Sequence, residues 1–439
     1  MYQILPQLIL YGNLRNDSIL NTLDEVTYSI GENKSGMDLL QRNSLITKVH
    51  SSINNLLQVA IEHGFTMDLW QNYIAYLIAM NENPFSLSVE GTKDREDSLK
   101  EIVLKELKYI KELFFYDFSK IENFLGISVF STISSSNQCP NKKSINPLLS
   151  ERVIGLYVEL KECNNEIEMY HVIRNFYKSY GVGILGLNKA FRLGKVKNEL
   201  SLLAIQTANN IKLSNLIGYE IQKKKLIDNT EAFIHGYKCN NVLLFGDSGT
   251  GKSTSVKAIL NQYYDKGLRM IELYKHEFKD LSALIGMLRM RNYKFIIFMD
   301  DLSFEEFEIE YKYLKAVIEG GLEEKPDNIL IYATSNRRHL IRETWSDRSD
   351  MSKDELHHSD TMEEKLSLVS RFGVTINFSS PNQSEFFEIV KELARKEGIT
   401  LSEDELLKKA NMWELSHGGK SGRTAQQFIH YLSHMESQT

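Results

Sequence analysis

Apolar residues in the first part of the chain recur at the three- and four-residue spacing of amphipathic helices. The clearest case is the run Leu99, Val103, Leu107, Ile110 and Phe114, with Lys and Glu between these residues. The stretches 39–61 and 153–161 repeat the pattern. We therefore expect a mostly α-helical N-terminal domain over residues 1–200. Near 131–147, Ser, Asn and two prolines replace the apolar pattern, which predicts a loop or linker there.

After about residue 215, short apolar runs alternate with helical patterns. Five of these runs have the length and composition of buried strands: 242–245, 270–273, 295–299, 329–333 and 374–378. Helical segments separate most of them, as crossover connections do in a parallel sheet. We therefore predict an α/β domain with a five-stranded parallel sheet over residues 201–380.

Beyond Pro381 the pattern becomes helical again. Ser402 and Glu405 form a capping-box sequence ahead of Leu406, which marks the start of a helix. Two consecutive glycines at 418 and 419 precede a last helical stretch near 421–434. These features predict a small helical C-terminal domain over residues 381–439.

Composition narrows the class of protein only a little. The 439 residues are 42% hydrophobic and 25% charged, as in ordinary soluble globular proteins. A formal net charge of −6 gives no overall attraction to nucleic acid, so a nucleic-acid partner is disfavoured, although a local basic patch leaves it open. The three cysteines form no C-x-x-C pair, and no window approaches 18 uninterrupted apolar residues. We therefore expect a cytoplasmic protein with reduced thiols and no membrane span.

Residues 246–253 read GDSGTGKS and match the pattern G-x-x-x-x-G-K followed by Ser or Thr. Glycines let the backbone turn its N–H groups toward phosphate oxygens, and the following helix directs its positive end at the same anion. Lys252 can reach the β- and γ-phosphates, and the Ser253 hydroxyl can bind Mg²⁺. The alternative is a glycine-rich turn without a ligand. An apolar run precedes the pattern and a helical stretch follows it, which favours an ATP site. Its residues are Gly246, Asp247, Ser248, Gly249, Thr250, Gly251, Lys252, Ser253 and Thr254.

A second glycine pattern, G-x-G-x-x-G at 181–186, follows a helical, Tyr-rich stretch instead of a strand. A dinucleotide site needs this pattern between a strand and a helix. A structural turn is therefore the better interpretation.

Two carboxylates follow the apolar run 295–299. A strand beside the phosphate-loop strand would bring Asp300 to the metal, and Asp301 could then orient or deprotonate the attacking water. The alternative is an acidic turn at the end of a buried strand. The polar tip of the run 329–333 could place Asn336 against the γ-phosphate or the water, and its alternative is a simple polar strand end.

Together these elements resemble the AAA+ superfamily over about residues 215–436, as Walker A, Walker B and sensor 1. Three further stretches are similar to family motifs. LIGY at 216–219 resembles the segment that packs on the adenine, SRFG at 370–373 the arginine-finger segment, and SGRT at 421–424 the sensor 2 motif of a helical lid. More narrowly, FMDDLSFE and IYATSNRRHL resemble a poorly characterised bacterial group of predicted AAA+ ATPases.

The resemblance implies a P-loop AAA+ core with a C-terminal helical lid, and ATP and Mg²⁺ as cofactors. It implies that Ile217 and Gly218 contact the nucleotide and that Arg423 contacts it from the lid. Arg371 would reach the site of a neighbouring subunit, which implies a homo-oligomer. The implied function is Mg-dependent ATP hydrolysis coupled to remodelling or loading of an unknown macromolecule, and we expect the N-terminal domain to select that partner.

The sequence departs from the family in two places. Most AAA+ proteins carry Asp-Glu where this chain has Asp300 and Asp301, so the second carboxylate is one methylene shorter. Water positioning could then involve Glu305 or Glu306, and hydrolysis could be slow. A slow-hydrolysing ATP-dependent switch or scaffold is therefore an alternative function, as is a DNA-associated loader.

The second departure is a polar, charged insert at 342–364. It is either a solvated loop or a contact with a client. Its adjacent His357 and His358 have no further ligands near them in the sequence, so a metal site is not expected there.

Overall fold

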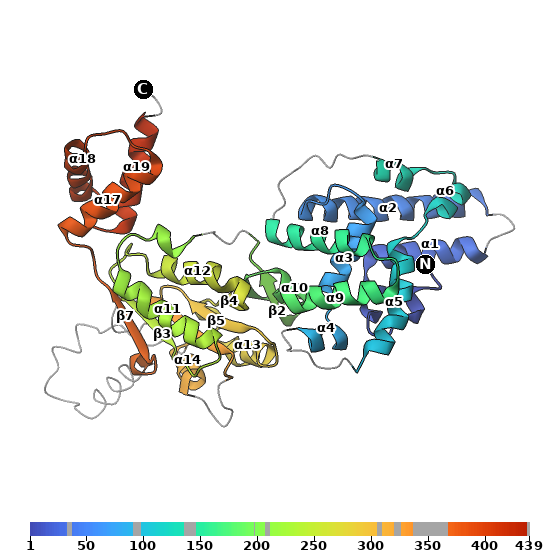
Figure 1. The fold of residues 1–439 in the computed structure, drawn as a ribbon, viewed down its shortest axis with the longest axis horizontal. Coiled ribbons are helices and arrows are strands. Elements are labelled where there is room, and N and C mark those ends of the chain that lie inside the picture. The colour runs from blue at the N-terminus through green and yellow to red at the C-terminus, as the bar shows by residue number, and fades with distance from the viewer. Residues whose placement is uncertain are drawn as a thin grey trace. The chain divides into compact units, whose positions relative to one another are not determined.

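The computed structural model describes residues 1–32, 37–90, 98–135, 146–196, 198–206, 211–304, 310–319, 326–336 and 368–436. Contacts within the chain divide it into two compact units, Met1–Asn188 and Lys189–Thr439 (Figure 1). The further division near residue 380 that the sequence suggests stays a prediction. Every helix in the described ranges is too short or too polar to cross a bilayer.

The N-terminal unit consists of helices, as the apolar spacing predicts. Helices form over all three stretches that show this spacing most clearly. In chain order the helices are α1 (Ser18–Glu32), α2 (Leu39–His63), α3 (Leu69–Met80), α4 (Pro84–Val89), α5 (Lys100–Phe114), α6 (Ser119–Leu125), α7 (Val129–Ser135), α8 (Pro147–Lys161), α9 (Glu166–Tyr180) and α10 (Gly183–Leu187). The predicted linker at 131–147 needs a correction, because α7 occupies its start. Residues 136–145 lie outside the described ranges.

The first residues of the chain form two short 3₁₀ turns, Leu5–Gln7 and Gly12–Asn16, which are fastened to α5. Glu106 on α5 is 2% exposed. Its carboxylate accepts the backbone N–H groups of Ile9 at 3.0 Å, Leu10 at 2.9 Å and Tyr11 at 3.1 Å. A buried carboxylate is costly unless hydrogen bonds compensate it, and these three donors do so.

The second glycine pattern lies at a helix boundary. Gly181 ends α9 with a φ of 81°, and α10 begins at Gly183. The N–H of Val182 donates to the buried carboxylate of Glu90 at 3.2 Å. The pattern thus forms a turn between two helices.

The C-terminal unit is built on a seven-stranded sheet with the order β2-β1-β4-β5-β6-β3-β7. All neighbouring strands are parallel except β1 and β2, which form an antiparallel pair. The strands are β1 (Ala190–Val196), β2 (Glu199–Ala204), β3 (Val242–Gly246), β4 (Leu268–Glu272), β5 (Lys294–Met299), β6 (Ile329–Ser335) and β7 (Val374–Phe378). The five runs predicted as strands all form strands and lie side by side.

The prediction of five strands is incomplete, because β1 and β2 extend the sheet at one edge. Most of this hairpin falls within the stretch predicted to be helical. Arg192, Gly194 and Lys195 interrupt the apolar pattern of β1, and β2 alternates only weakly. Both strands are partly exposed and need no continuous apolar run, so their sequence signal is weak.

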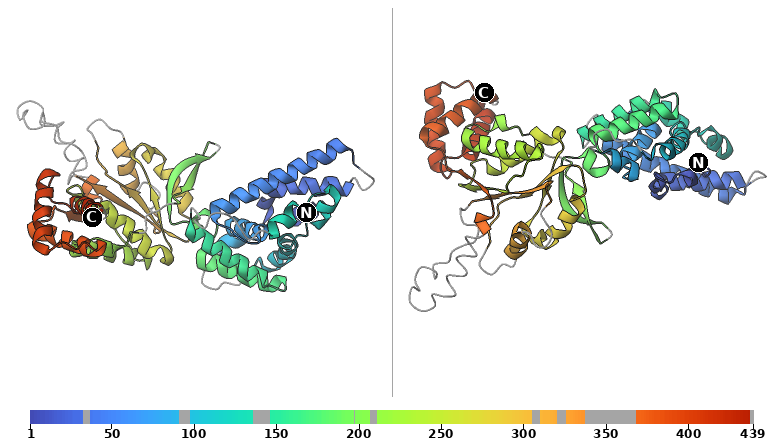
Figure 2. Two further views of the ribbon diagram at one scale, coloured as in Figure 1. Left: turned by 90° about the horizontal axis from the view of Figure 1, so that it is seen from above. Right: turned by 60° about the horizontal axis from the view of Figure 1, so that its bottom comes forward.

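Helices cover both faces of the sheet. α11 (Glu220–Ile234) and α12 (Lys252–Tyr263) pack on the face that carries Val242, Leu244 and Ile296. Figure 2 shows α13 (Leu281–Leu288) and α14 (Glu310–Glu319) on the opposite side. Three 3₁₀ turns complete the described elements before β6: Leu213–Asn215, Tyr264–Lys266 and Lys275–Asp280. The central strands are therefore buried on both faces, which explains their continuous apolar runs.

Three helices follow the sheet: α17 (Gln383–Glu397), α18 (Glu403–Ser416) and α19 (Gly422–Glu436). They pack around an apolar cluster of their own, which includes Phe386, Leu406 and Phe428. Asn382 and Glu385 form a capping box at the start of α17. At the predicted capping box of α18, the Ser402 hydroxyl accepts the N–H of Glu405 at 3.4 Å.

Candidate functional site

The loop between β3 and α12 turns through three glycines with positive φ. Gly246 has a φ of 130° and Gly249 a φ of 76°, and residues other than glycine rarely adopt such positive φ angles. A Cβ atom at Gly246 would lie 2.2 Å from the carbonyl oxygen of Phe378 on β7. The loop therefore passes so close to β7 that only glycine fits there.

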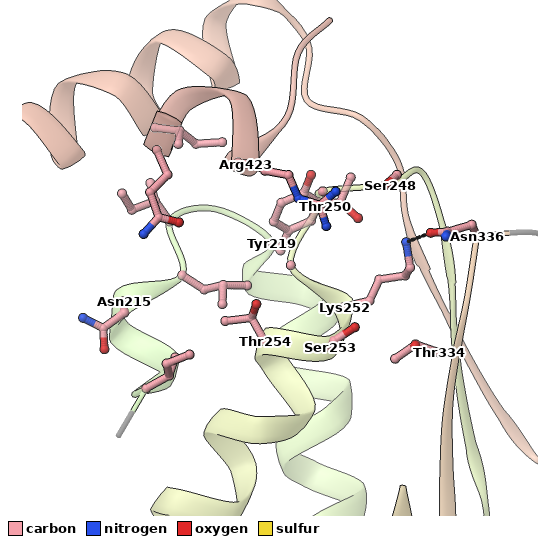
Figure 3. A pocket seen from close by; sticks show the side chains of 18 of the residues that line it. Asn215, Tyr219, Ser248, Thr250, Lys252, Ser253, Thr254, Thr334, Asn336 and Arg423 are labelled. Carbon is pink, nitrogen blue, oxygen red and sulfur yellow. Dashed lines mark hydrogen bonds between the residues drawn. The ribbon is translucent and has the colours of Figure 1, made fainter. Parts of the chain in front are cut away.

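Lys252, the first residue of α12, points back along this loop. Its Nζ donates to the carbonyl of Gly246 at 2.9 Å, the carbonyl of Asp247 at 2.6 Å and Oδ1 of Asn336 at 3.0 Å (Figure 3). The residue is 6% exposed, and this burial lowers the pKa of its ammonium group. The carboxylates of Asp247, Asp301 and Asp300 act in the opposite direction and favour the charged form.

Asp300 lies at the carboxyl end of β5 and faces α12. Its Oδ1 accepts the hydroxyl of Ser253 at 2.5 Å and the hydroxyl of Thr334 at 2.6 Å. Nζ of Lys257 lies 3.8 Å from its other oxygen. A hydroxyl and a carboxylate within hydrogen-bond distance offer the oxygen ligands that Mg²⁺ prefers. In the described ranges, this site included, no three His, Cys, Asp or Glu side chains gather in a way that could hold a metal ion.

Asp301 adopts a left-handed backbone conformation with a φ of 52°. Its N–H donates to the Thr334 hydroxyl at 2.9 Å, and its Oδ1 accepts Nδ2 of Asn336 at 2.8 Å. Asn336 therefore bridges Lys252 and Asp301 through the two ends of its amide. The structure thus brings together the ends of β3, β5 and β6, as expected for parallel strands with a site at their carboxyl ends.

These side chains face a cavity of about 740 Å³. Its lining includes most of the residues that the sequence analysis selected: Ile217, Ser248, Gly249, Thr250, Gly251, Lys252, Ser253, Thr254, Asp300, Asp301, Asn336 and Arg423. The lining does not include Gly246, Asp247, Gly218 or Arg371. Arg371 is exposed and lies just before β7. Glu305, Glu306 and the insert at 342–364 with its two histidines lie outside the described residues.

The loop also contacts the chain just before α17 and at the start of α19. Oδ2 of Asp247 accepts the N–H of Ser380 at 2.7 Å, and this hydrogen bond lowers the pKa of the Asp247 carboxyl. The carbonyl of Gly249 accepts the N–H of Arg423 at 3.2 Å, at the start of α19. A displacement of the loop would therefore alter hydrogen bonds to the segments that lead into α17 and α19.

Sequence reasoning did not select several residues that line the cavity. Gln426 follows Arg423 by three positions on α19, and Ile389 and Leu393 are four apart on α17, so each pair shares a helix face. Thr334 lies in the polar strand tip from which only Asn336 was chosen. The remaining residues are Ile211, Asn215, Leu216 and Tyr219, which precede α11, and Gly422, which begins α19. Leu216, Tyr219 and Gly422 belong to the motif stretches 216–219 and 421–424, but no role was assigned to them individually. The helical spacing was a usable signal for the first two pairs, and the strand tip for Thr334.

Comparison with protein-family models finds one match, over residues 187–436, to the family described as "Protein of unknown function (DUF815)". No curated protein matches the chain. The matched range begins next to the boundary of the C-terminal unit and spans more than half of the chain. This match agrees with the resemblance of the chain to a poorly characterised group of proteins, while its membership of the AAA+ superfamily stays a prediction.

Among solved structures, the chain is similar to RuvB of Thermotoga maritima. Two RuvB mutants match 52% of this chain with 18% and 19% identity and a TM-score of 0.37, and the matches cover 66% and 65% of the RuvB chains. A third structure, described as the RuvB Holliday junction branch migration motor, matches 51% of this chain with 16% identity and a TM-score of 0.32. The chain thus spans slightly less than two thirds of the first two relatives. Similarity at this level says nothing about activity, substrate or assembly.

Proposed function

The chain belongs to the DUF815 family, and we propose that it binds ATP with Mg²⁺ and hydrolyses it in the cavity between the sheet and the C-terminal helices. One observation carries the proposal. Lys252, Ser253, Asp300, Asp301 and Asn336 come from three elements, are joined by hydrogen bonds, and face one cavity. The ammonium group of Lys252 lies at the start of α12, directly after the glycine loop, and the carboxylates of Asp300 and Asp301 lie opposite it. This arrangement suits the binding of a nucleoside triphosphate and its metal ion.

In this proposal, the glycine loop and the start of α12 bind the phosphates. Residues 248–254 line the cavity, so the unpaired N–H groups of the first turn of α12 can face phosphate oxygens. Lys252 adds a charge-assisted hydrogen bond to the β/γ region. At the other end, Ile217, Leu216 and Leu393 give the cavity apolar walls suited to a flat base.

In the same proposal, the carboxylate of Asp300 binds the metal and the carboxylate of Asp301 acts on the attacking water. Ser253 and Asp300 would hold Mg²⁺, which when bound would draw charge from the phosphate oxygens. Asp301 would orient a water for attack and take up its proton, while Asn336 holds the Asp301 carboxylate in place.

The position of Arg371 supports an assembly-dependent reaction. It is exposed and does not line the cavity of its own chain. An arginine at such a place can complete the site of a neighbouring copy, where its planar guanidinium would pair with phosphate oxygens. Arg423 would act from the lid in the same chain. Coupled motion of the assembled subunits would remodel or load a macromolecule chosen by the N-terminal unit.

The test is ATP turnover as a function of protein concentration for the wild type, Arg371→Ala, and an equal mixture of the two. We expect turnover to rise with concentration and to collapse in Arg371→Ala, while ATP binding is retained. Lys252→Ala serves as the site control and should lose ATP affinity. A wild-type protein that binds no ATP would refute the proposed function.

The second candidate is a switch that binds ATP and hardly turns it over. It is favoured by the short carboxylate of Asp301, whose Oδ1 is already bonded to Asn336. Slow turnover that is independent of concentration and insensitive to Arg371→Ala would select this function over the assembled motor.

A further inference from the structure

Thr334 connects the two carboxylates of the site, although the sequence analysis assigned it no role. Its side chain is 1% exposed and belongs to β6, two residues before Asn336. The hydroxyl donates to Oδ1 of Asp300 at 2.6 Å and accepts the N–H of Asp301 at 2.9 Å. A threonine hydroxyl has one proton and two lone pairs, so both bonds can exist at the same time.

The main chain of Thr334 adds a third connection to the same turn. Its carbonyl accepts the N–H of Leu302 at 2.6 Å. Three consecutive residues, Asp300, Asp301 and Leu302, are thus held by one residue of the neighbouring strand. The side chain of Thr334 also faces the cavity, and Figure 3 shows it across the space between α12 and β6 from Ser253.

The turn held in this way is strained at its centre. Asp301 has a φ of 52°, and a left-handed conformation is unfavourable for most residues, although Asp tolerates it better than bulkier ones. Such a conformation persists where surrounding contacts determine it. The hydrogen bond from its N–H to Thr334 is one of these contacts, and the bond from Asn336 to its carboxylate is another.

We infer that Thr334 is a positioning residue, which sets the metal-facing carboxylate of Asp300 and the left-handed turn of Asp301 together. In this arrangement the backbone turn determines where the short Asp301 side chain points. The inference rests on the proposed function, because it assigns these carboxylates to Mg²⁺ and water.

The experiment compares Thr334→Val, which keeps the shape and removes the hydroxyl, with Thr334→Ser, which keeps the hydroxyl. Thr230→Val is the matched control. Thr230 is fully buried beside β6, and its hydroxyl donates to the carbonyl of Leu226 and contacts the hydroxyl of Tyr332, but it does not line the cavity. The readouts are Mn²⁺ affinity of the complex with ADP, kcat and KM for MgATP, and hydrogen exchange of a peptide over 298–304.

We expect Thr334→Val to weaken Mn²⁺ binding and lower kcat by about 10- to 100-fold, as loss of a group that orients a metal ligand typically does. ADP affinity without metal and KM for ATP should stay unchanged, exchange at 298–304 should rise, and Thr334→Ser should recover most of the loss. Thr230→Val should leave Mn²⁺ affinity unchanged. If Thr334→Val does not fold, Thr334→Ala replaces it in the same comparison.

The failures can be told apart. A Thr334→Val protein with wild-type Mn²⁺ affinity, kcat and exchange would overturn the inference and leave the proposed function intact. Equal losses in Thr230→Val would overturn it too, because the effect would then follow from any buried hydroxyl near β6. A wild-type protein that binds neither ADP nor ATP would overturn both.

Discussion

Buried polar groups are arranged differently in the two units. In the N-terminal unit, Glu106 and Glu90 are each 2% exposed and accept N–H groups of the backbone. In the C-terminal unit, Lys252 and Thr334 are buried to a similar degree but line a cavity. The partners of Lys252 and Thr334 include side chains of other elements that line the same cavity. A side chain at a cavity can exchange a hydrogen bond to another side chain for a hydrogen bond to a ligand. The carboxylate of Glu106, in contrast, is occupied by three backbone N–H groups and holds the segment 9–11 in place.

The comparison predicts that polar substitutions in the two units have opposite consequences. A change at the cavity should alter binding or turnover and leave stability nearly unchanged. A change at a buried carboxylate of the N-terminal unit should do the reverse.

The largest effect is expected at Asp301. Asp301→Asn keeps the size of the side chain, tolerates the left-handed backbone and can still accept the hydrogen bond from Asn336, but it cannot take a proton. Loss of a general base costs about 10²–10⁴ in rate, so we expect kcat for ATP to fall by about 1000-fold. ATP affinity and the melting temperature should stay near the wild-type values. A variant that hydrolyses ATP at the wild-type rate would show that Asp301 is not the base.

Glu106→Ala tests the other side of the comparison. It leaves the N–H groups of Ile9, Leu10 and Tyr11 without their acceptor in a buried place. Each such loss costs about 1–3 kcal/mol, so we expect the N-terminal unit to lose about 4 kcal/mol of stability. Urea titration measures this loss, and hydrogen exchange at residues 9–11 locates it.

The matched control for Glu106→Ala is Glu112→Ala, at an exposed position of the same helix. It should leave stability within about 0.5 kcal/mol of the wild type. ATP affinity should be unaffected by either change. A loss of ATP affinity in a folded Glu106→Ala protein would contradict the separation of roles between the two units.

Lys252→Ala sharpens the comparison within the cavity. The substitution removes the charge that we assign to the phosphates, and a charge-assisted hydrogen bond contributes about 1.5–3 kcal/mol. ATP affinity should therefore fall by about 10- to 150-fold, measured by isothermal titration calorimetry. Lys225→Ala is the control, because Lys225 is exposed on α11 and does not line the cavity. Equal losses in both variants would point to a general charge effect.

The smallest effect concerns pH. The hydrogen bond from Ser380 lowers the pKa of Asp247, so the folded state favours its charged form. The resulting stability is present above the ordinary Asp value of about 3.9 and is lost as pH falls through the lower folded-state value. Because Asp247 is exposed, the melting temperature should change by no more than a few degrees. Melting curves of wild type and Asp247→Asn should differ at pH 7 and converge in acid; parallel curves would remove Asp247 from this role.

Much of the sheet and of the site could be predicted from sequence because both leave local signals. A strand buried on both faces needs a continuous apolar run, and all five such runs were found. Glycines with positive φ and the polar tips of β5 and β6 are also local. The hairpin of β1 and β2 was missed, since an edge pair carrying Arg192, Gly194 and Lys195 has no such run.

The parts of the site that were missed depend on distant contacts. Ile389, Leu393 and Gln426 lie more than 130 residues after the phosphate loop, and only the packing of α17 and α19 brings them to the cavity. Thr334 acts through a hydrogen bond to the backbone of another strand, and that bond requires the register of β5 and β6. The polar tip of β6 makes Thr334 a candidate for the site, but no local property of the sequence reveals that its hydroxyl joins the two carboxylates.

The close approach of Phe378 to Gly246 also bears on which sequences this protein can tolerate. The carbonyl oxygen of Phe378 occupies the place where any side chain at 246 would begin, although Gly246 itself does not line the cavity. In a library with all twenty residues at each loop position, position 246 should therefore accept only glycine, while exposed Ser248 should accept many substitutes. Intolerance to substitution at 246 would thus reflect the space beside β7 and not contact with a phosphate.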